Sequence, residues 1–349
     1  MTHRPAVFAI PGDIETLTGG YIYERRLLLG LRKAGHNMAH LQLGDSFPDP
    51  SPADRAQAID ALTAVKPERA LILDGLVYGS IDPAGLARVT APIVAMIHHP
   101  LARETGLNSE RQEHLYRTER ANLRLAQQVL VPSGHTASIL TTDYGVEPGR
   151  ITIAPPGTDR PSGRPAPIDP PLILSVGIQH PRKGHDILLR ALARIHDTPW
   201  QAVIVGSAHD PAHAKDLAQI AKDLGLSDRV TLAGRVPGET LAAYYRQASI
   251  FALATRYEGY GIVFDEALSC GLPIISCRTG AVPDTVPDTA GLLVPPDDHT
   301  ALANALHTLL HDGPMRQRMA QAAAEAGRLL PGWDDTARIA SGVLNKLTR

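Results

Sequence analysis

Cysteine is scarce in this sequence. The chain of 349 residues contains only two, Cys270 and Cys277, which is too few for the disulfide framework of a small secreted domain. Their Cys-x6-Cys spacing also matches no common zinc pattern. We therefore interpret both as reduced, mostly buried side chains.

The sequence also lacks a long apolar run and an excess of one charge. No run approaches the roughly 20 apolar residues that span a bilayer, and the apolar stretch near the start is too short for a signal peptide. Lys+Arg 34 nearly balance Asp+Glu 36, with a net charge of -2, which argues against a generally basic nucleic-acid binder. We expect a cytoplasmic protein without a nucleic-acid partner, which can at most touch the inner face of a membrane.

A proline-rich stretch at residues 155–171 divides the sequence. Prolines fix φ and remove backbone donors, so neither a helix nor a central strand can run through it. The length also suits two domains. We expect a first domain at residues 1–157, a linker at 158–171 and a second domain at 172–332. A final helix at about 333–349 is expected to cross back to the first domain.

Short apolar runs alternate with amphipathic segments in both halves. The predicted strands are residues 6–10, 70–73, 92–97, 128–131, 172–176, 202–205, 229–233, 250–253, 273–276 and 291–294. The predicted helices include the segment that follows a loop ending in Gly19 and Gly20 and runs through Lys33, and residues 109–126, 185–195 and 211–224. Continuously apolar strands that alternate with helices indicate parallel sheets covered on both faces. The predicted fold class is α/β, with two doubly wound, Rossmann-like domains facing across a cleft, where ligands bind beyond the carboxyl ends of the strands.

The densest group of polar residues and glycines lies between residues 255 and 273. It follows a predicted strand and opens a helix, so the Gly259 and Gly261 turn presents backbone N–H groups at a positive helix terminus, which suits phosphate. Glu258 precedes this helix and Glu266 lies within it. Carboxylates accept paired hydrogen bonds from sugar diols, so each could meet one end of a ligand. The alternative is an ordinary helix start with two surface glutamates.

This stretch resembles the E-x7-E signature of retaining glycosyltransferase family 4, whose members have the two-domain GT-B fold. The resemblance implies that Glu266 holds the ribose hydroxyls of a nucleotide and that Glu258 lies near the transferred sugar. It also implies that a short turn stabilises the leaving diphosphate through its amides. The residues of this turn are Gly259, Tyr260, Gly261 and Ile262.

Two segments of the first half are similar to the same family. Gly19 and Gly20 resemble its glycine-rich loop, where glycine lets the backbone approach a phosphate or an acceptor; an ordinary strand-to-helix turn is the alternative. His98 and His99 end a predicted strand at the cleft edge. Because the family has a sugar-contacting histidine at the end of this strand, we favour His98, with a core histidine as the alternative.

A basic pair in the second half, Arg182 and Lys183, is similar to the cations of the family's strand-loop-helix. At a helix start such cations can bind a diphosphate and stabilise its charge as it develops; a solvated basic pair is the alternative. Many family members have arginine directly after the glycine that aligns with Gly177, whereas this chain has Ile178. Lys183 matches the family's lysine, and whether Arg182 replaces the missing guanidinium stays open.

The resemblance also predicts where the base binds and what the site lacks. Gly206, Ser207, Arg235 and Val236 follow two predicted strands and would enclose the base largely through backbone groups, which does not define the base. The sequence contains no Asp-x-Asp triplet, the motif that holds a metal-bound diphosphate in the other large transferase fold. We expect no metal and no cofactor, with a UDP- or GDP-sugar as co-substrate.

The predicted function is a retaining glycosyltransferase that moves a hexose from a nucleotide-diphosphate sugar to a glycan, lipid or small-molecule acceptor. Three alternatives stay open. A sugar-nucleotide epimerase or a phosphorylase would share the architecture, and a non-catalytic sugar-binding protein would share the two lobes.

Arginines on the predicted helix at 109–126 could make a weak peripheral membrane contact. Glutamates on the same helix favour a solvated charged face instead. The arginines are Arg117, Arg120 and Arg124, and the glutamates are Glu110, Glu113 and Glu119.

Overall fold

A computed structural model describes residues 4–161 and 163–347 of the chain. It divides into two compact units, one reaching Gly157 and including the segment from Pro331, the other spanning Thr158–Leu330. Within the described ranges, no helix is both long and apolar enough to cross a bilayer. Cys270 and Cys277 are free thiols, the second of them buried.

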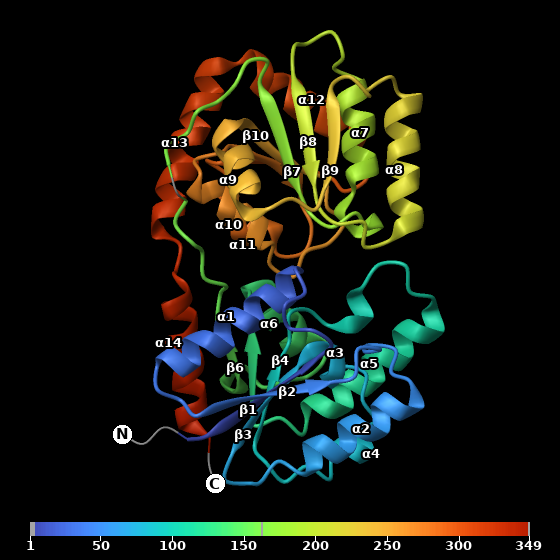
Figure 1. The fold of residues 1–349 in the computed structure, drawn as a ribbon, viewed down its shortest axis with the longest axis vertical. Coiled ribbons are helices and arrows are strands. Elements are labelled where there is room, and N and C mark those ends of the chain that lie inside the picture. Colours follow the sequence, from blue (N-terminus) through green and yellow to red (C-terminus); the bar gives the residue numbers. More distant parts are fainter. Residues whose placement is uncertain (1–3, 162, 348–349) are drawn as a thin grey trace. The chain divides into compact units, whose positions relative to one another are not determined.

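The first unit is built on a six-stranded parallel sheet with the order β2-β1-β3-β4-β5-β6. The strands are β1 (Ala6–Pro11), β2 (Met38–Leu43), β3 (Ala70–Asp74), β4 (Ile93–Met96), β5 (Gln128–Val131) and β6 (Ile151–Ile153). The helices are α1 (Gly19–Lys33), α2 (Pro52–Thr63), α3 (Gly75–Tyr78), α4 (Pro83–Leu86), α5 (Ser109–Leu123), α6 (Gly134–Thr142) and α14 (Trp333–Lys346), with 3-10 turns at η1 (Leu101–Arg103) and η2 (Pro148–Arg150). Alternate strand residues enter two separate buried clusters, so both faces of the sheet are covered (Figure 1).

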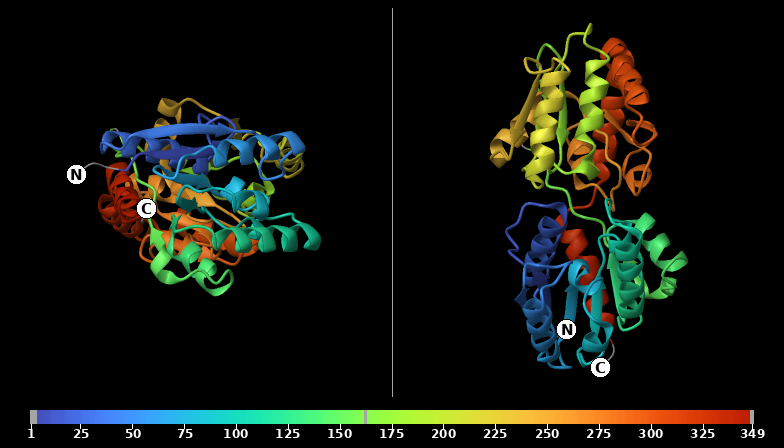
Figure 2. Two further views of the ribbon diagram at one scale, coloured as in Figure 1. Left: turned by 90° about the horizontal axis from the view of Figure 1, so that it is seen from below. Right: turned by 90° about the vertical axis from the view of Figure 1, so that its right-hand side faces the viewer.

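The second unit repeats this plan with the strand order β12-β11-β10-β7-β8-β9, again all parallel. Its strands are β7 (Leu172–Val176), β8 (Gln201–Val205), β9 (Val230–Gly234), β10 (Ala248–Leu253), β11 (Ile274–Cys277) and β12 (Gly291–Val294). Its helices are α7 (His185–Ala193), α8 (Pro211–Asp223), α9 (Gly238–Gln247), α10 (Ile262–Ser269), α11 (Val282–Thr285), α12 (His299–His311) and α13 (Gly313–Leu329), with a 3-10 turn at η3 (Pro181–Lys183). Helices lie on both faces of this sheet too (Figures 1 and 2). The predicted α/β class with two doubly wound sheets is confirmed.

The structure differs from the sequence-based prediction at two kinds of position. α1 begins at Gly19, with Thr18 as its extended N-cap, so Gly19 and Gly20 form the first helical turn rather than a loop. Strands β2 and β6 were not predicted. Each pairs with a single neighbour at an edge of the sheet, and β2 carries polar residues within its run. Edge strands lack the continuous apolar run by which buried strands are recognised.

The last helix, α14, belongs to the first unit, where it runs alongside α1 (Figures 1 and 2). A Cβ added at Gly30 of α1 would lie 2.7 Å from the Cβ of Ala337, so the two helices are in close contact. The Trp333 ring meets the ring of Tyr23 edge to face, and the Thr336 hydroxyl donates to the carbonyl of Pro155 at 2.7 Å. These contacts hold the chain's last helix against its first.

Candidate active site

Three of the predicted site residues in the second unit are in direct contact. Lys183 Nζ lies 2.5 Å from Glu258 Oε1, and Arg182 Nη1 lies 3.5 Å from Glu258 Oε2. The hydroxyl of Thr255 donates to Glu258 Oε1 at 3.0 Å, and only 5% of Glu258 is exposed. The fold therefore joins the basic pair to the first glutamate of the E-x7-E segment.

Two glycines make this approach of distant segments feasible. Gly184 ends η3 with a φ of 63°, and a Cβ there would overlap the carbonyl of Ala254 just after β10. Gly280 has a φ of 53°, and a Cβ there would overlap the carbonyl of Glu258. Because both positions combine left-handed backbone with close packing, each requires glycine.

The local charges decide the ionisation of Glu258. Its burial acts to raise the pKa, but the charges of Lys183 and Arg182 and the hydrogen bonds from Lys183 and Thr255 outweigh burial and lower it. Glu258 is thus a carboxylate at neutral pH. It can accept hydrogen bonds from hydroxyl groups but cannot donate one.

Glu266, the second glutamate of the segment, lies on α10. The hydroxyl of Tyr245 on α9 donates to Glu266 Oε2 at 2.6 Å, which orients the carboxyl group. Burial raises the pKa of Glu266, although the bond from Tyr245 opposes this shift. The next carboxyl group, Asp265, was not among the predicted site residues. Burial raises its pKa to about 7, against a hydrogen bond from Tyr260, and it supports the preceding turn from within.

The predicted phosphate-binding turn stands at the start of α10. Gly261 is the N-cap with a φ of 92°, and Ile262 is the first residue of the helix. The Tyr260 hydroxyl donates to Asp265 Oδ2 at 2.7 Å, and the Thr285 hydroxyl donates to the Tyr260 carbonyl at 2.9 Å. The turn, with Gly259 before it, is therefore held from both the helix and α11.

The predicted base-binding residues lie at the same edge of the sheet. Gly206 follows β8, and a Cβ there would overlap the carbonyl of Gly177 after β7. Ser207 accepts a backbone hydrogen bond from Gln179 at 2.8 Å. Arg235 and Val236 come directly after β9, and Arg235 is exposed. Because β7, β8, β9 and β10 are parallel neighbours, these loops are adjacent at one edge.

In the first unit, the structure brings Gly20 and His98 together. A Cβ at Gly20 would lie 3.5 Å from Cδ2 of His98, which follows β4, and the ring of Tyr23 meets the His98 ring edge to face at 5.4 Å. Gly19 precedes this contact as the first residue of α1. His99 instead lies 2.9 Å from a carboxyl oxygen of Glu104.

Two buried carboxyl groups beside His98 were missed by sequence reasoning. Glu24 and Asp74 are 1% and 3% exposed, and Glu24 Oε1 lies 3.6 Å from His98 Nε2. Asp74 ends β3, so its position at a strand's carboxyl end was a usable signal. Glu24 lies on the face of α1 that also carries the buried residues Leu27 and Leu31. A carboxyl group on the apolar face of a helix is the second signal.

Burial governs the ionisation of this group. It raises the pKa of Glu24 to about 7, against a hydrogen bond with Asp74. It also raises the pKa of Asp74 well above the ordinary value, with the charge of Glu24 adding to the effect. Burial lowers the pKa of His98, and the charge of Asp74 opposes this shift. His98 is therefore neutral at neutral pH.

The same three side chains lie close enough together to be considered as a cation site. Among the residues that the structure describes, Glu24, Asp74 and His98 are the one group of three whose ligand atoms all lie within 4.8 Å of one another. Burial raises the pKa of both carboxyl groups, which favours the protonated form, and a protonated carboxyl group is a poor ligand for a cation. We therefore do not assign these residues as metal ligands.

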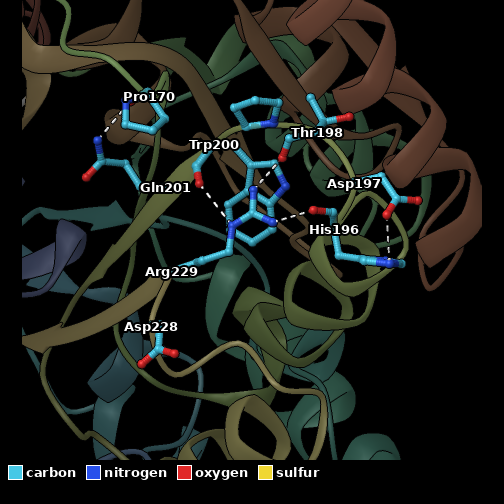
Figure 3. Close-up of a pocket in the computed structure, with 9 residues that line it drawn as sticks. Pro170, His196, Asp197, Thr198, Trp200, Gln201, Asp228 and Arg229 are labelled. Atoms are coloured by element: carbon cyan, nitrogen blue, oxygen red, sulfur yellow. Dashed lines mark hydrogen bonds and ion pairs between the residues drawn. The ribbon is translucent and has the colours of Figure 1, made fainter.

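A separate pocket of about 480 Å³ lies at the opposite end of the second sheet (Figure 3). There the Arg229 guanidinium stacks 3.7 Å above the Trp200 ring. It also donates to the carbonyls of Trp200 and His196 at 3.1 and 2.6 Å and to that of Thr198. Trp200 precedes β8 whereas Gly206 follows it, so this pocket is distinct from the predicted site. The guanidinium of Arg229 is already hydrogen-bonded to backbone carbonyls.

The chain is similar to known proteins in both sequence and fold. A family model described as "Glycosyl transferases group 1" matches residues 161–326, and one described as "Glycosyltransferase Family 4" matches residues 78–160. Among solved structures, a sucrose-phosphate synthase from Thermosynechococcus elongatus has a TM-score of 0.84 at 24% identity, covering 98% of both chains. Anabaena HepE in complex with UDP-glucose has a TM-score of 0.80 at 17% identity, covering 99% of this chain and 100% of that one.

Two curated relatives are also similar in sequence. The D-inositol 3-phosphate glycosyltransferase of Xylanimonas cellulosilytica is 32% identical over 59% of this chain and 54% of its own length. A GDP-mannose-dependent alpha-(1-6)-phosphatidylinositol monomannoside mannosyltransferase of Mycolicibacterium smegmatis is 33% identical over 56% of this chain and 52% of its own. The chain thus spans about half the length of the curated relatives that it matches.

Fold and matches together define the class as glycosyltransferases with the GT-B fold. Within that class, the chain belongs to glycosyltransferase family 4.

Proposed function

We propose that this chain is a retaining, metal-independent glycosyltransferase that moves a hexose from a UDP- or GDP-sugar to a hydroxylated acceptor. The observation that carries the proposal is the convergence of Lys183 and Arg182 on Glu258, directly before α10. Two cations and a helix N-terminus then meet at one point. Such a point suits a diphosphate without a bound ion.

In this proposal Lys183 and Arg182 bind the diphosphate and stabilise its charge as it leaves. The amides of the turn from Gly259 to Ile262 assist. Glu258, held as a carboxylate, accepts hydrogen bonds from hydroxyls of the transferred hexose. Arg182 would then supply the guanidinium that this chain lacks at Ile178.

The nucleotide would be bound along the same sheet edge. Glu266 accepts hydrogen bonds from the ribose hydroxyls, with Tyr245 fixing one of its oxygens. Loops after β8 and β9 enclose the base, through Gly206 and Ser207 in the first and through Arg235 and Val236 in the second.

The first unit would supply the hexose contact from His98 and the acceptor site near Gly19 and Gly20. The acceptor oxygen forms a bond to the anomeric carbon on the face from which the diphosphate leaves. The bond from that carbon to the phosphate oxygen breaks, and the leaving phosphate takes the acceptor's proton. The anomeric configuration is thereby retained.

The names of related proteins support a nucleotide-sugar donor. HepE structures of the same fold contain UDP or UDP-glucose, and the mycobacterial relative uses GDP-mannose. Several relatives act on D-inositol 3-phosphate, which makes a phosphorylated cyclitol one acceptor to test beside glycans and lipids.

The proposal is tested by incubating the purified protein with UDP-, GDP- and ADP-sugars and an acceptor panel in the presence of a chelator. We expect release of nucleoside diphosphate, with the donor's anomeric configuration in the product by NMR. Lys183→Met should abolish release, whereas Lys222→Met, on the exposed part of α8, should not. No release from any donor would contradict the enzyme, and turnover that needs manganese would contradict metal independence. A strict need for inorganic phosphate would favour a phosphorylase, and product formed without acceptor would favour an epimerase.

A further inference from the structure

Glu24 and Asp74 form a close pair of carboxyl groups inside the first unit, with oxygens within 4.8 Å of one another. They come from α1 and from the end of β3, and both are almost completely buried. An ionised carboxylate only accepts hydrogen bonds. A hydrogen bond between two carboxyl groups therefore needs a proton on one of them.

Within the described residues, His98 is the charged group that acts to lower the pKa of the pair, through Asp74. The titratable groups that face it are Tyr21 and Tyr23 on α1 and His98 after β4. Asp13 and Asp45 add negative charge beside Tyr21. Two ionised carboxylates would repel each other in this setting, which favours one shared proton.

His98 is the third member of the group. Its Nε2 lies 3.6 Å from Glu24 Oε1, and both atoms are buried without another hydrogen-bond partner. The His98 side chain is still 23% exposed, so another part of the ring reaches the surface. Glu24 Oε1 is thus the carboxyl oxygen toward which an Nε2–H would be attracted, and a proton on Nε2 leaves Nδ1 as an acceptor.

We propose that Glu24 and Asp74 share one proton and act together as positioning residues that fix the proton of the His98 ring on Nε2. The proposal rests on the proposed function only in that His98 contacts the transferred sugar. With Nε2–H directed at the pair, Nδ1 accepts a hydrogen bond from a sugar hydroxyl. The pair fixes the ring without touching the substrate.

The tautomer is measured by long-range 1H–15N correlation NMR on 15N-labelled protein between about pH 6 and about pH 8. His98→Gln identifies the His98 signals. We expect the neutral Nε2–H tautomer in the parent protein and a shifted tautomer population in Glu24→Gln. Glu119→Gln is the matched control, because Glu119 is also a fully buried carboxyl of the first unit and contacts Leu101 instead. It should leave the His98 signals unchanged.

Infrared spectroscopy tests the shared proton directly. At neutral pH, Glu24→Gln and Asp74→Asn should each lose the protonated-carboxyl absorption of this pair, while the absorption of Glu119 remains and is lost only in Glu119→Gln. The Asp74→Asn variant serves if Glu24→Gln does not fold. If the protein transfers sugar, Glu24→Gln should lower kcat about 100-fold, as for a small misplacement of a reacting group, with a smaller change in donor KM.

Three results would overturn the proposal: two ionised carboxylates, a His98 signal that Glu24→Gln does not move, or a stoichiometric metal ion in the purified parent that is lost in Asp74→Asn. The NMR and infrared measurements need no turnover. A protein without transferase activity would contradict the proposed function and leave this test intact.

Discussion

Lys183 Nζ and Glu258 Oε1 lie 2.5 Å apart, although 75 residues separate them in the sequence. Both side chains are largely shielded, at 12% and 6% exposure. Removing one partner of a buried ion pair leaves an uncompensated charge, which costs about 3–5 kcal/mol. The pair therefore links the stability of the second unit to the proposed diphosphate site.

Lys183→Met should lower the free energy of unfolding by about 3 kcal/mol. This value is at the lower end of the range for a broken buried ion pair because Arg182 still faces Glu258. The double variant Lys183→Met/Glu258→Gln should recover most of this loss, since the buried charge is gone, but should remain inactive. Chemical denaturation measures the first effect and nucleoside diphosphate release the second. Equal stability of the single and double variants would show that the pair is not coupled.

Gly280→Ala should destabilise the protein more than Gly225→Ala. Both glycines have left-handed backbone, with φ of 53° and 68°, so both substitutions carry a backbone cost of about 1–2 kcal/mol. Only the Cβ at Gly280 meets other atoms, those of Glu258, and this overlap should add about 1–3 kcal/mol. Thermal and chemical unfolding of the two variants measure the difference. Identical losses of stability in the two variants would mean that the backbone near Glu258 moves to accommodate the added Cβ without cost.

Glu119→Gln should stabilise the protein increasingly as the pH rises. Burial raises the pKa of Glu119 to about 8, against a bond from the Leu101 amide, while an unfolded glutamate titrates at about 4.3. Between these values the folded state holds a proton that the unfolded state has lost, so the free energy of unfolding falls as pH rises. Glutamine does not ionise, so the Glu119→Gln variant does not lose stability in this way. Its gain in free energy of unfolding over the parent should be small near pH 4 and largest near pH 8.

Chemical denaturation across that range measures this gain, with Glu113→Gln as the control. Glu113 lies on the same helix, with its side chain 55% exposed, and its substitution should show no such pH dependence. A gain for Glu119→Gln that is constant with pH would mean that Glu119 does not hold a proton in the fold.

Glu266→Ala should weaken nucleoside diphosphate binding about 10-fold or more, as expected for the loss of a charged hydrogen-bonding group. Glu258→Ala should chiefly slow transfer, and Tyr245→Phe, which removes the donor to Glu266, should weaken nucleotide binding less than Glu266→Ala. Calorimetric titration measures the affinities, with the exposed Glu239→Ala on α9 as control. Equal nucleotide affinity in the Glu258 and Glu266 variants would contradict these separate roles.

Part of this protein was predictable because local patterns report local burial. Strands β5, β7 and β12 have the predicted bounds, since each is a short apolar run between turn residues. The E-x7-E segment was visible because its glycines and glutamates lie within one strand-to-helix connection. The edge strands β2 and β6 were missed because their polar residues hide that pattern.

The sequence alone determined two doubly wound α/β units and the residue types of the proposed diphosphate and sugar site. Only the tertiary structure decided which of these residues meet: Lys183 with Glu258, α14 with α1, and Glu24 with Asp74 and His98. Each contact joins segments that different strands and helices carry. Strand order and close packing set such distances, and no local pattern of residues encodes them.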